Sequence, residues 1–219
     1  MKELYIIGAG GFGREIAWLV ERINEQKFTW DLRGFVDDNR TIWGKEFDEY
    51  RVLGGCDYLR NADHDVWAVC AVGASRTRKK IIDSLVGATH LHFATVIDPS
   101  VQISKRVQIG EGTMICAGNI ITVGVTIGKH TIINLDCTIG HDAVLGDFVT
   151  MYPSVNVSGS TTIGSETELG TGMQTIQGIR IGSQTIVGAG SVVIRELPDR
   201  CVAVGSPAKV IKTLDNNSR

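Results

Sequence analysis

His141 and Asp142 are adjacent, and their side-chain types are suited to moving a proton. A carboxylate bonded to one imidazole nitrogen fixes the tautomer and leaves the other nitrogen free to accept a proton. Adjacent residues of a flat strand point to opposite faces, so this pairing requires a turn, which Gly140 favours. The pair therefore predicts a general base, and the alternative is a histidine with a structural role only.

The pair lies inside a six-residue repeat that runs from residue 97 to residue 192. At steps of six from Ile97, every position through Val187 is aliphatic or methionine except Thr175. The next residue is often glycine, and the fifth position is mostly small or β-branched. We expect the glycines to adopt the positive φ of sharp corners and the small residues to fill a narrow interior. Neither an α-helix nor an alternating strand has this period.

This repeat resembles that of the hexapeptide left-handed parallel β-helix, in which about eighteen residues complete one triangular coil. The resemblance implies about five coils and a homotrimer of coils packed side by side. At that spacing, the column of stacked residues through His141 also contains Gly159. A glycine beside the histidine predicts an open notch on the outer wall, wide enough for the arm of a thioester cofactor.

A metal site is not expected in the coil, because a third histidine is lacking there. His130 and His141 occupy different positions of their hexapeptides and different faces of the prism. The pattern therefore disfavours a hexapeptide carbonic anhydrase, whose zinc needs three histidines. We expect His130 at a solvated corner. Cys137, at an inward fifth position, is expected in the core rather than as a nucleophile.

The front part of the chain predicts a different fold. A buried strand, the glycine motif of residues 8–13 and an amphipathic helix follow one another, as in dinucleotide-binding folds. Backbone N–H groups at such a helix start favour a phosphate, and Asp37-Asp38 follow a second strand at a distance suited to a ribose or base. About ninety residues suffice for one mononucleotide-binding half, so a nucleotide-linked ligand is favoured over NAD. Alternatively, the glycines only permit close packing and the two aspartates form a solvated turn.

Fold class and domain limits follow. We expect an α/β Rossmann-like domain with a small parallel sheet over residues 1–92. An all-β left-handed parallel β-helix with a short C-terminal extension is expected over residues 93–219.

Composition narrows the class of partner and the compartment. The net charge of −2 and the lack of a basic cluster argue against nucleic acid and anionic membranes. No apolar stretch is long enough to span a membrane. The beginning of the chain reads as a strand rather than a signal peptide. Five scattered cysteines without CxxC spacing indicate reduced thiols and a cytoplasmic protein.

Taken together, the chain resembles sugar acetyltransferases of the bacillosamine, perosamine and sialic acid type. The resemblance rests on the motifs GAGGFGREI, GFVDDN, LGG, IINLDCTIGHD, VSGSTTIG and GSPAK. It implies acetyl transfer from acetyl-CoA to a sugar amine or hydroxyl without a metal, most simply the amine of a nucleotide-linked amino sugar. Alternatives are O-acetylation of sialic acid or another sugar, and a non-catalytic structural β-helix.

The resemblance also implies roles for individual residues. His141 is expected as the general base, Asp142 as its support and Asn134 as a residue near the acceptor. The nucleotide part of the substrate is assigned to Gly10, Gly11, Phe12, Asp37, Asp38, Gly54 and Gly55, and acetyl-CoA to Thr150, Gly159, Thr171 and Ala189.

Three positions depart from the family pattern. Many members carry histidine where this chain has Phe12, and some carry histidine where it has Thr150. The first difference concerns the contact to the nucleotide, and the second lies on the cofactor side. Neither removes the base, but both leave the identity of the substrate open. The Asp142 position is often glutamate, which keeps the same chemistry.

Overall fold

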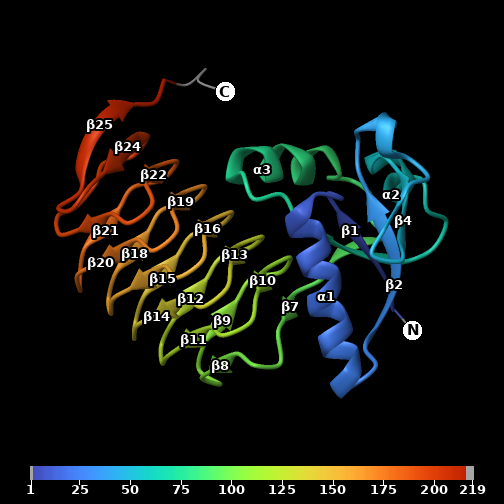
Figure 1. Cartoon of the computed structure of the whole chain (residues 1–219), viewed down its shortest axis with the longest axis horizontal. Helices are drawn as coiled ribbons and strands as arrows, with labels where there is room; N and C mark the ends of the chain where they lie inside the picture. The colour runs from blue at the N-terminus through green and yellow to red at the C-terminus, as the bar shows by residue number, and fades with distance from the viewer. Residues whose placement is uncertain (1, 216–219) are drawn as a thin grey trace. The chain divides into compact units, whose positions relative to one another are not determined.

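The computed structural model describes residues 2–215, so Met1 and the last four residues of the expected C-terminal extension lie outside the described residues. Contacts divide the chain into two compact units, Met1–Pro99 and Ser100–Arg219. Figure 1 shows helices and a sheet in the first unit and stacked short strands in the second. No helix among the described residues is long and apolar enough to cross a membrane.

The first unit is built on a sheet of six strands in the order β3-β4-β2-β1-β5-β6. All neighbouring strands are parallel except the β3–β4 hairpin. The expected Rossmann-like architecture is confirmed, and it includes a β3–β4 hairpin and a helix α2 that the sequence did not predict. The elements are β1 (Lys2–Ile7), α1 (Gly11–Gln26), β2 (Trp30–Val36), the 3-10 turn η1 (Arg40–Ile42), β3 (Glu46–Phe47), β4 (Tyr50–Gly54), α2 (Cys56–Arg60), β5 (Val66–Cys70), α3 (Ser75–Ser84), β6 (Leu91–Phe93) and β7 (Val96–Ile97).

The glycine motif joins β1 to α1 by a close approach of backbones. Gly8 adopts φ +100°, a conformation that side chains disfavour. Gly13 lies so close to the Gly8 carbonyl that any side chain there would collide with it. In contrast, substituents at Gly10 or Gly11 would meet nothing within 4 Å. Two glycines of the motif are therefore needed for packing, and the two between them leave the start of α1 open.

The second unit is a parallel β-helix whose strands form three sheets. The first sheet contains β10-β13-β16-β19-β22, the second β8-β11-β14-β17-β20-β23 and the third β9-β12-β15-β18-β21. The strands are β8 (Gln102–Ile103), β9 (Gln108–Ile109), β10 (Met114–Ile115), β11 (Ile120–Ile121), β12 (Thr126–Ile127), β13 (Ile132–Ile133), β14 (Thr138–Ile139), β15 (Val144–Leu145), β16 (Thr150–Met151), β17 (Asn156–Val157), β18 (Thr162–Ile163), β19 (Glu168–Leu169), β20 (Gln174–Thr175), β21 (Arg180–Ile181), β22 (Ile186–Val187) and β23 (Val192–Val193). The hairpin β24 (Cys201–Val204) and β25 (Lys209–Thr213) extends the first sheet.

The six-residue repeat sets the register, as predicted. The repeat aliphatics are the second residues of two-residue strands, and most of them pair with the residue eighteen positions on, as Ile115 does with Ile133. Near the end of the coil the spacing shortens, and Val187 pairs with Ala203. From Ile115 onward these side chains are at most 6% exposed. Buried threonines at the fifth position satisfy their hydroxyls on the next coil, since Thr113 donates to the Gly128 carbonyl at 2.9 Å and Thr167 to the Gly182 carbonyl at 2.7 Å.

The expected role of the glycine after each strand was wrong. These glycines are absent from the positive-φ residues, which instead occupy the fourth position of many hexapeptides, as at Gly172 (φ +70°) and Asp136 (φ 57°). The glycine after a strand is required by close stacking. A Cβ at Gly170 would lie 2.5 Å from the Ala189 nitrogen of the next coil.

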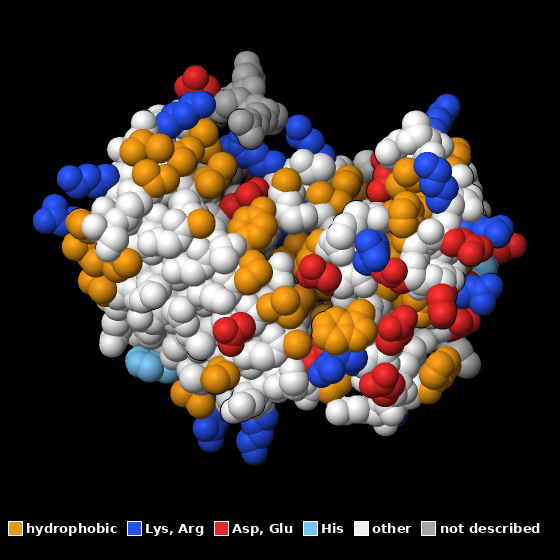
Figure 2. Space-filling view, in the orientation of Figure 1, with side chains coloured by type: hydrophobic (Ala, Val, Ile, Leu, Met, Phe, Trp, Pro, Cys, Tyr) orange, Lys and Arg blue, Asp and Glu red, His pale blue; other side chains and the backbone are white. Residues whose placement is uncertain are grey.

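The visible surfaces of the two units differ in charge. In Figure 2 the wall of the coil in view is largely white, with lysine and arginine mainly at its edges. The visible face of the first unit mixes acidic and basic side chains. The wall in view thus offers few charged contacts.

Candidate functional site

His141 and Asp142 lie together in the turn between β14 and β15, at the corner between the second and third sheets. Asp142 adopts φ 58°, which makes the sharp turn, and its N–H donates to the Val123 carbonyl at 3.0 Å. The Ser160 N–H donates to the His141 carbonyl at 2.7 Å. Both neighbouring coils therefore fix this backbone.

The turn lets two adjacent side chains meet. His141 Nδ1 lies 2.9 Å from Asp142 Oδ2, and the two side chains are 50% and 66% exposed. With the carboxylate accepting from Nδ1–H, Nε2 carries the lone pair and accepts a proton. This geometry has the form of an oriented general base on the outside of the coil.

Gly159 lies directly beneath the imidazole, in the next coil. A Cβ at this position would be 2.6 Å from His141 Nε2 and 2.8 Å from Cε1. Gly159 is itself buried, so the open notch expected here is wrong, because the imidazole occupies that space. Because Gly159 has no side chain, the imidazole ring can pack directly against its backbone.

Asn134 follows β13, at the corner between the first and second sheets, and is thus on a different corner from His141. Its side-chain oxygen accepts from the Leu135 N–H at 2.8 Å. The buried Asn119 donates to the Asn134 carbonyl at 2.9 Å and accepts from the Cys137 N–H at 2.9 Å. Asn119 was not singled out from the sequence, although it occupies an inward fifth position where a polar side chain is unusual.

The four residues expected to contact acetyl-CoA do not lie close together within a single chain. Thr171 and Ala189 are exposed and occupy equivalent positions in successive coils, at the corner between the first and second sheets. Gly159 lies at the corner that holds His141, and Thr150 is buried in β16 of the first sheet. The second sheet separates the two corners.

In the first unit, the residues expected to hold a nucleotide surround the ends of β1, β2 and β4. Asp37 accepts from the Ala9 N–H at 3.0 Å and the Asn39 N–H at 2.9 Å, so both of its oxygens brace backbone. Asp38 Oδ1 accepts from the Cys56 N–H at 2.8 Å. Gly10 and Gly11 are exposed and Phe12 half-buried at the start of α1.

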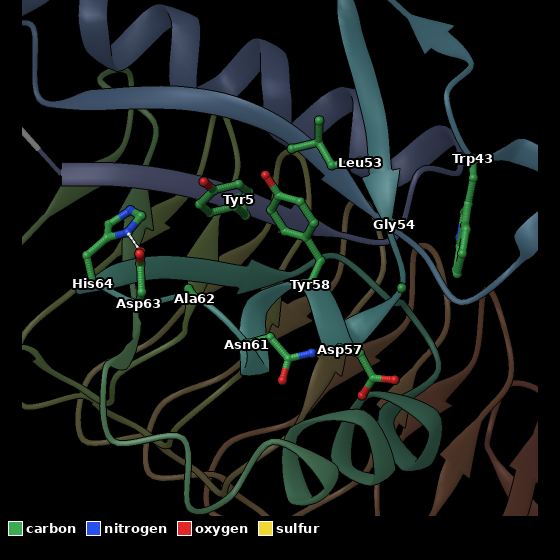
Figure 3. Close-up of a pocket in the computed structure, with 11 residues that line it drawn as sticks. Tyr5, Trp43, Leu53, Gly54, Asp57, Tyr58, Asn61, Ala62, Asp63 and His64 are labelled. Carbon is green, nitrogen blue, oxygen red and sulfur yellow. Dashed lines mark hydrogen bonds and ion pairs between the residues drawn. The ribbon is translucent and has the colours of Figure 1, made fainter.

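A cavity of about 610 Å³ opens beside two of these predicted residues, Gly54 and Gly55. Figure 3 shows Tyr5 and Tyr58 side by side in it, with Trp43 near Gly54 and His64 at the far end. The centroids of the two tyrosine rings are 5.8 Å apart, and burial raises the pKa of Tyr5 well above its usual range. Trp43, Tyr5 and Tyr58 were not predicted as site residues, because their sequence positions carry no motif.

Two expectations about other reactive side chains are resolved. Cys137 is fully buried, as predicted, and burial raises the pKa of its thiol to about 12. His130 is only 4% exposed and stacks on Phe148 with ring centroids 5.0 Å apart, so the expectation of a solvated corner was wrong. Over residues 2–215, no cluster of three or more His, Cys, Asp or Glu side chains is placed to hold a metal ion.

The chain joins a small Rossmann-like domain to a β-helix built on a six-residue repeat, and a histidine–carboxylate pair lies on an outer corner of the coil. These features define the class of hexapeptide acyltransferases. The chain belongs to the family of hexapeptide-repeat sugar acetyltransferases with an N-terminal Rossmann-like domain. The model for the PglD N-terminal domain matches residues 3–85.

Solved structures of similar proteins cover nearly the whole chain. The acetyltransferase domain of PglB from Neisseria gonorrhoeae, in complex with acetyl coenzyme A, is 29% identical, with a TM-score of 0.86 over 96% of this chain and 99% of that one. A histidine-to-asparagine mutant of perosamine N-acetyltransferase from Caulobacter crescentus, with CoA and GDP-perosamine, is 30% identical, with a TM-score of 0.85 over 97% and 98%. WeeI from Acinetobacter baumannii is 29% identical, with a TM-score of 0.85 over 96% and 100%.

Curated relatives match over a shorter stretch. The 2,3,4,5-tetrahydropyridine-2,6-dicarboxylate N-acetyltransferase of Clostridium perfringens is 41% identical over 44 residues, which is 20% of this chain and 19% of that protein. The chain thus spans about a fifth of the length of the curated relatives that it matches.

Proposed function

We propose that this protein transfers the acetyl group of acetyl-CoA to the amino group of a nucleotide-linked amino sugar. The observation that carries the proposal is the His141–Asp142 pair, held at 2.9 Å on the outer corner of the coil. Support for the substrate class comes from the similar perosamine N-acetyltransferase, whose structure holds CoA and GDP-perosamine.

The reaction needs one proton acceptor and no covalent enzyme intermediate. The neutral amine nitrogen attacks the thioester carbonyl carbon, a C–N bond forms, and the C–S bond breaks. His141 Nε2 takes the proton from the nitrogen and returns it to the departing CoA thiolate, while Asp142 stabilises the imidazolium. Cys137 takes no part, because it is buried with a raised thiol pKa.

We assign the nucleotide part of the substrate to the first unit. The open backbone at Gly10 and Gly11 offers N–H groups at the start of α1 to a phosphate. Asp38 uses one carboxylate oxygen on the Cys56 N–H, and the other is assigned to the ribose or base. Asp37 is assigned a positioning role, since both of its oxygens accept from backbone.

The active form is proposed to be a homotrimer in which neighbouring coils complete the site. In one chain, the exposed Thr171 and Ala189 lie on a different corner from His141. A second copy that places its Thr171–Ala189 corner beside His141 would bring the acetyl-CoA contacts to the base. Exposed aliphatic side chains around the His141 corner fit such a neighbour: Ile120, Val123, Val144, Ile176 and Ile194, each between 41% and 45% exposed.

The choice between amine and hydroxyl acceptors is tested by a panel assay. Thiol release from acetyl-CoA is measured with GDP-perosamine, with UDP-linked amino sugars, with the matching hydroxyl sugars and with free sialic acid. Thiol release and an N-acetyl product with an amino-sugar nucleotide are expected. Turnover only with hydroxyl acceptors would contradict the amine assignment. A lack of turnover with every acceptor would contradict the proposal that this protein acetylates sugars.

A further inference from the structure

Trp43 is an exposed aromatic residue that is fixed in place beside the cavity of the first unit. It follows the short turn η1, and its indole Nε1 donates to the Asp37 carbonyl at 2.7 Å. The side chain is nevertheless 43% exposed. An indole that is anchored through its N–H while part of its ring stays exposed resembles a preformed contact surface more than part of a core.

Trp43 lies next to residues that the proposed function assigns to the nucleotide. A Cβ at Gly55 would lie 3.3 Å from Trp43 Cζ2 and 2.7 Å from Asp38 Oδ1, so the glycine separates the indole from the carboxylate. Figure 3 shows the indole edge-on, with a face turned toward Gly54. The Arg40 guanidinium lies 5.6 Å from the ring centroid and helps to fix the ring.

We infer that Trp43 is the surface on which the heteroaromatic base of the nucleotide stacks. This inference rests on the proposed function and adds to it the residue that recognises the base. Every base has a π-face, so an aromatic platform holds it without reading its identity. Asn61, which also lines the cavity, offers an amide to the polar edge of the base. Asp57, another lining residue, accepts from Arg60 through Oδ1 and offers its other carboxylate oxygen.

Binding measurements on three variants test the inference. Trp43→Leu removes the ring, Trp43→Phe keeps an aromatic face, and Trp18→Leu removes another exposed tryptophan, located on α1, as a matched control. Calorimetry with UDP, GDP and inorganic pyrophosphate is the readout. For the nucleotide that binds wild type, Trp43→Leu should raise Kd about tenfold or more, Trp43→Phe much less, and Trp18→Leu not at all.

Two further readouts separate stacking from a structural role. Because pyrophosphate lacks a base, its Kd should be the same in wild type and Trp43→Leu. Nucleotide should quench tryptophan fluorescence in wild type and in Trp18→Leu, and the quench should largely disappear in Trp43→Phe. The fluorescence test holds even if Trp43→Leu fails to fold.

The outcomes that overturn the inference differ from those that overturn the proposed function. Nucleotide binding that Trp43→Leu leaves unchanged, or an equal loss of nucleotide and pyrophosphate affinity, refutes the stacking role alone. Wild-type protein that binds no nucleotide refutes the nucleotide-linked substrate and the stacking role together.

Discussion

The imidazole of His141 is oriented by its immediate neighbour, Asp142, and seated on Gly159 of the next coil. The first contact depends on the positive φ of Asp142, which turns two adjacent side chains to the same side. The second depends on the lack of a Cβ beneath the ring. Orientation and position of the proposed base are therefore set by different residues.

Gly159→Ala tests whether the base needs the space that Gly159 leaves beneath the imidazole ring. The added methyl group would lie 2.6 Å from His141 Nε2, and the exposed imidazole can move away at little cost in folding. Acetyl transfer should fall by about 10-fold or more, because the base leaves its position. The temperature of unfolding should change little. Normal turnover by a folded variant would show that the packing of His141 on Gly159 is not needed.

At the scale of the secondary structure elements, glycines of the coil have two separate uses. Gly170 is needed because the next coil's backbone lies where a Cβ would be, whereas Gly172 only adopts φ +70° in open space. The equivalent turn position in an earlier coil is Ser154, at φ 60°. A side chain is thus already tolerated at that kind of turn.

The two uses predict a large effect of substitution on stability at one glycine and a small effect at the other. Gly170→Ala should lower the free energy of unfolding by about 1–3 kcal/mol, since the methyl group is forced against backbone. Gly172→Asn, although larger, should cost less than about 1 kcal/mol, because asparagine tolerates the left-handed region. Chemical denaturation of both variants gives the comparison. A less stable Gly172→Asn would reverse the assignment.

His64, in the segment between α2 and β5, forms an ion pair with Glu3 of β1. Its Nδ1 lies 2.8 Å from Asp63 and its Nε2 3.0 Å from Glu3. The hydrogen bonds to Asp63 and Glu3 raise the pKa of His64 above its ordinary value of 6.5 and lower the pKa of both carboxyl groups. The Arg33 guanidinium also faces Glu3.

The raised pKa of His64 predicts a pH-dependent contribution to stability. It is fully present below about pH 6.5 and is lost as the pH rises through the higher folded-state value, because only protonated His64 attracts both carboxylates. The unfolding temperature of His64→Gln should therefore lie below that of wild type at about pH 5.5, and the gap should close toward about pH 8. A gap that widens with rising pH would contradict the ion-pair account.

For the whole molecule, the exposed aliphatic side chains around the His141 corner predict self-association of the coil. Light scattering after size exclusion should give three times the chain mass of 23.7 kDa. Ile176→Asp, on the exposed corner, should weaken the assembly by placing a charge in an apolar contact. A monomeric wild-type protein with full activity would contradict the shared site.

The coil was predictable because its repeat is local and unbroken, so each strand and each inward position can be counted from the sequence. The same count places Phe148 eighteen residues after His130, which would have indicated their stacking. Other features depend on contacts that no period encodes. The anchoring of Trp43 by the Asp37 carbonyl and the bracing of Ala9 by Asp37 depend on how distant loops fold together.

The central claim, that His141 is the general base, is tested most directly by the kinetics of His141→Asn. Thiol release from acetyl-CoA is measured with the best amino-sugar nucleotide, alongside the unfolding temperature and the oligomeric state. We predict a fall in kcat of about 10²- to 10⁴-fold, with KM, stability and assembly near those of wild type. A folded variant whose kcat stays within about threefold of wild type would contradict the account.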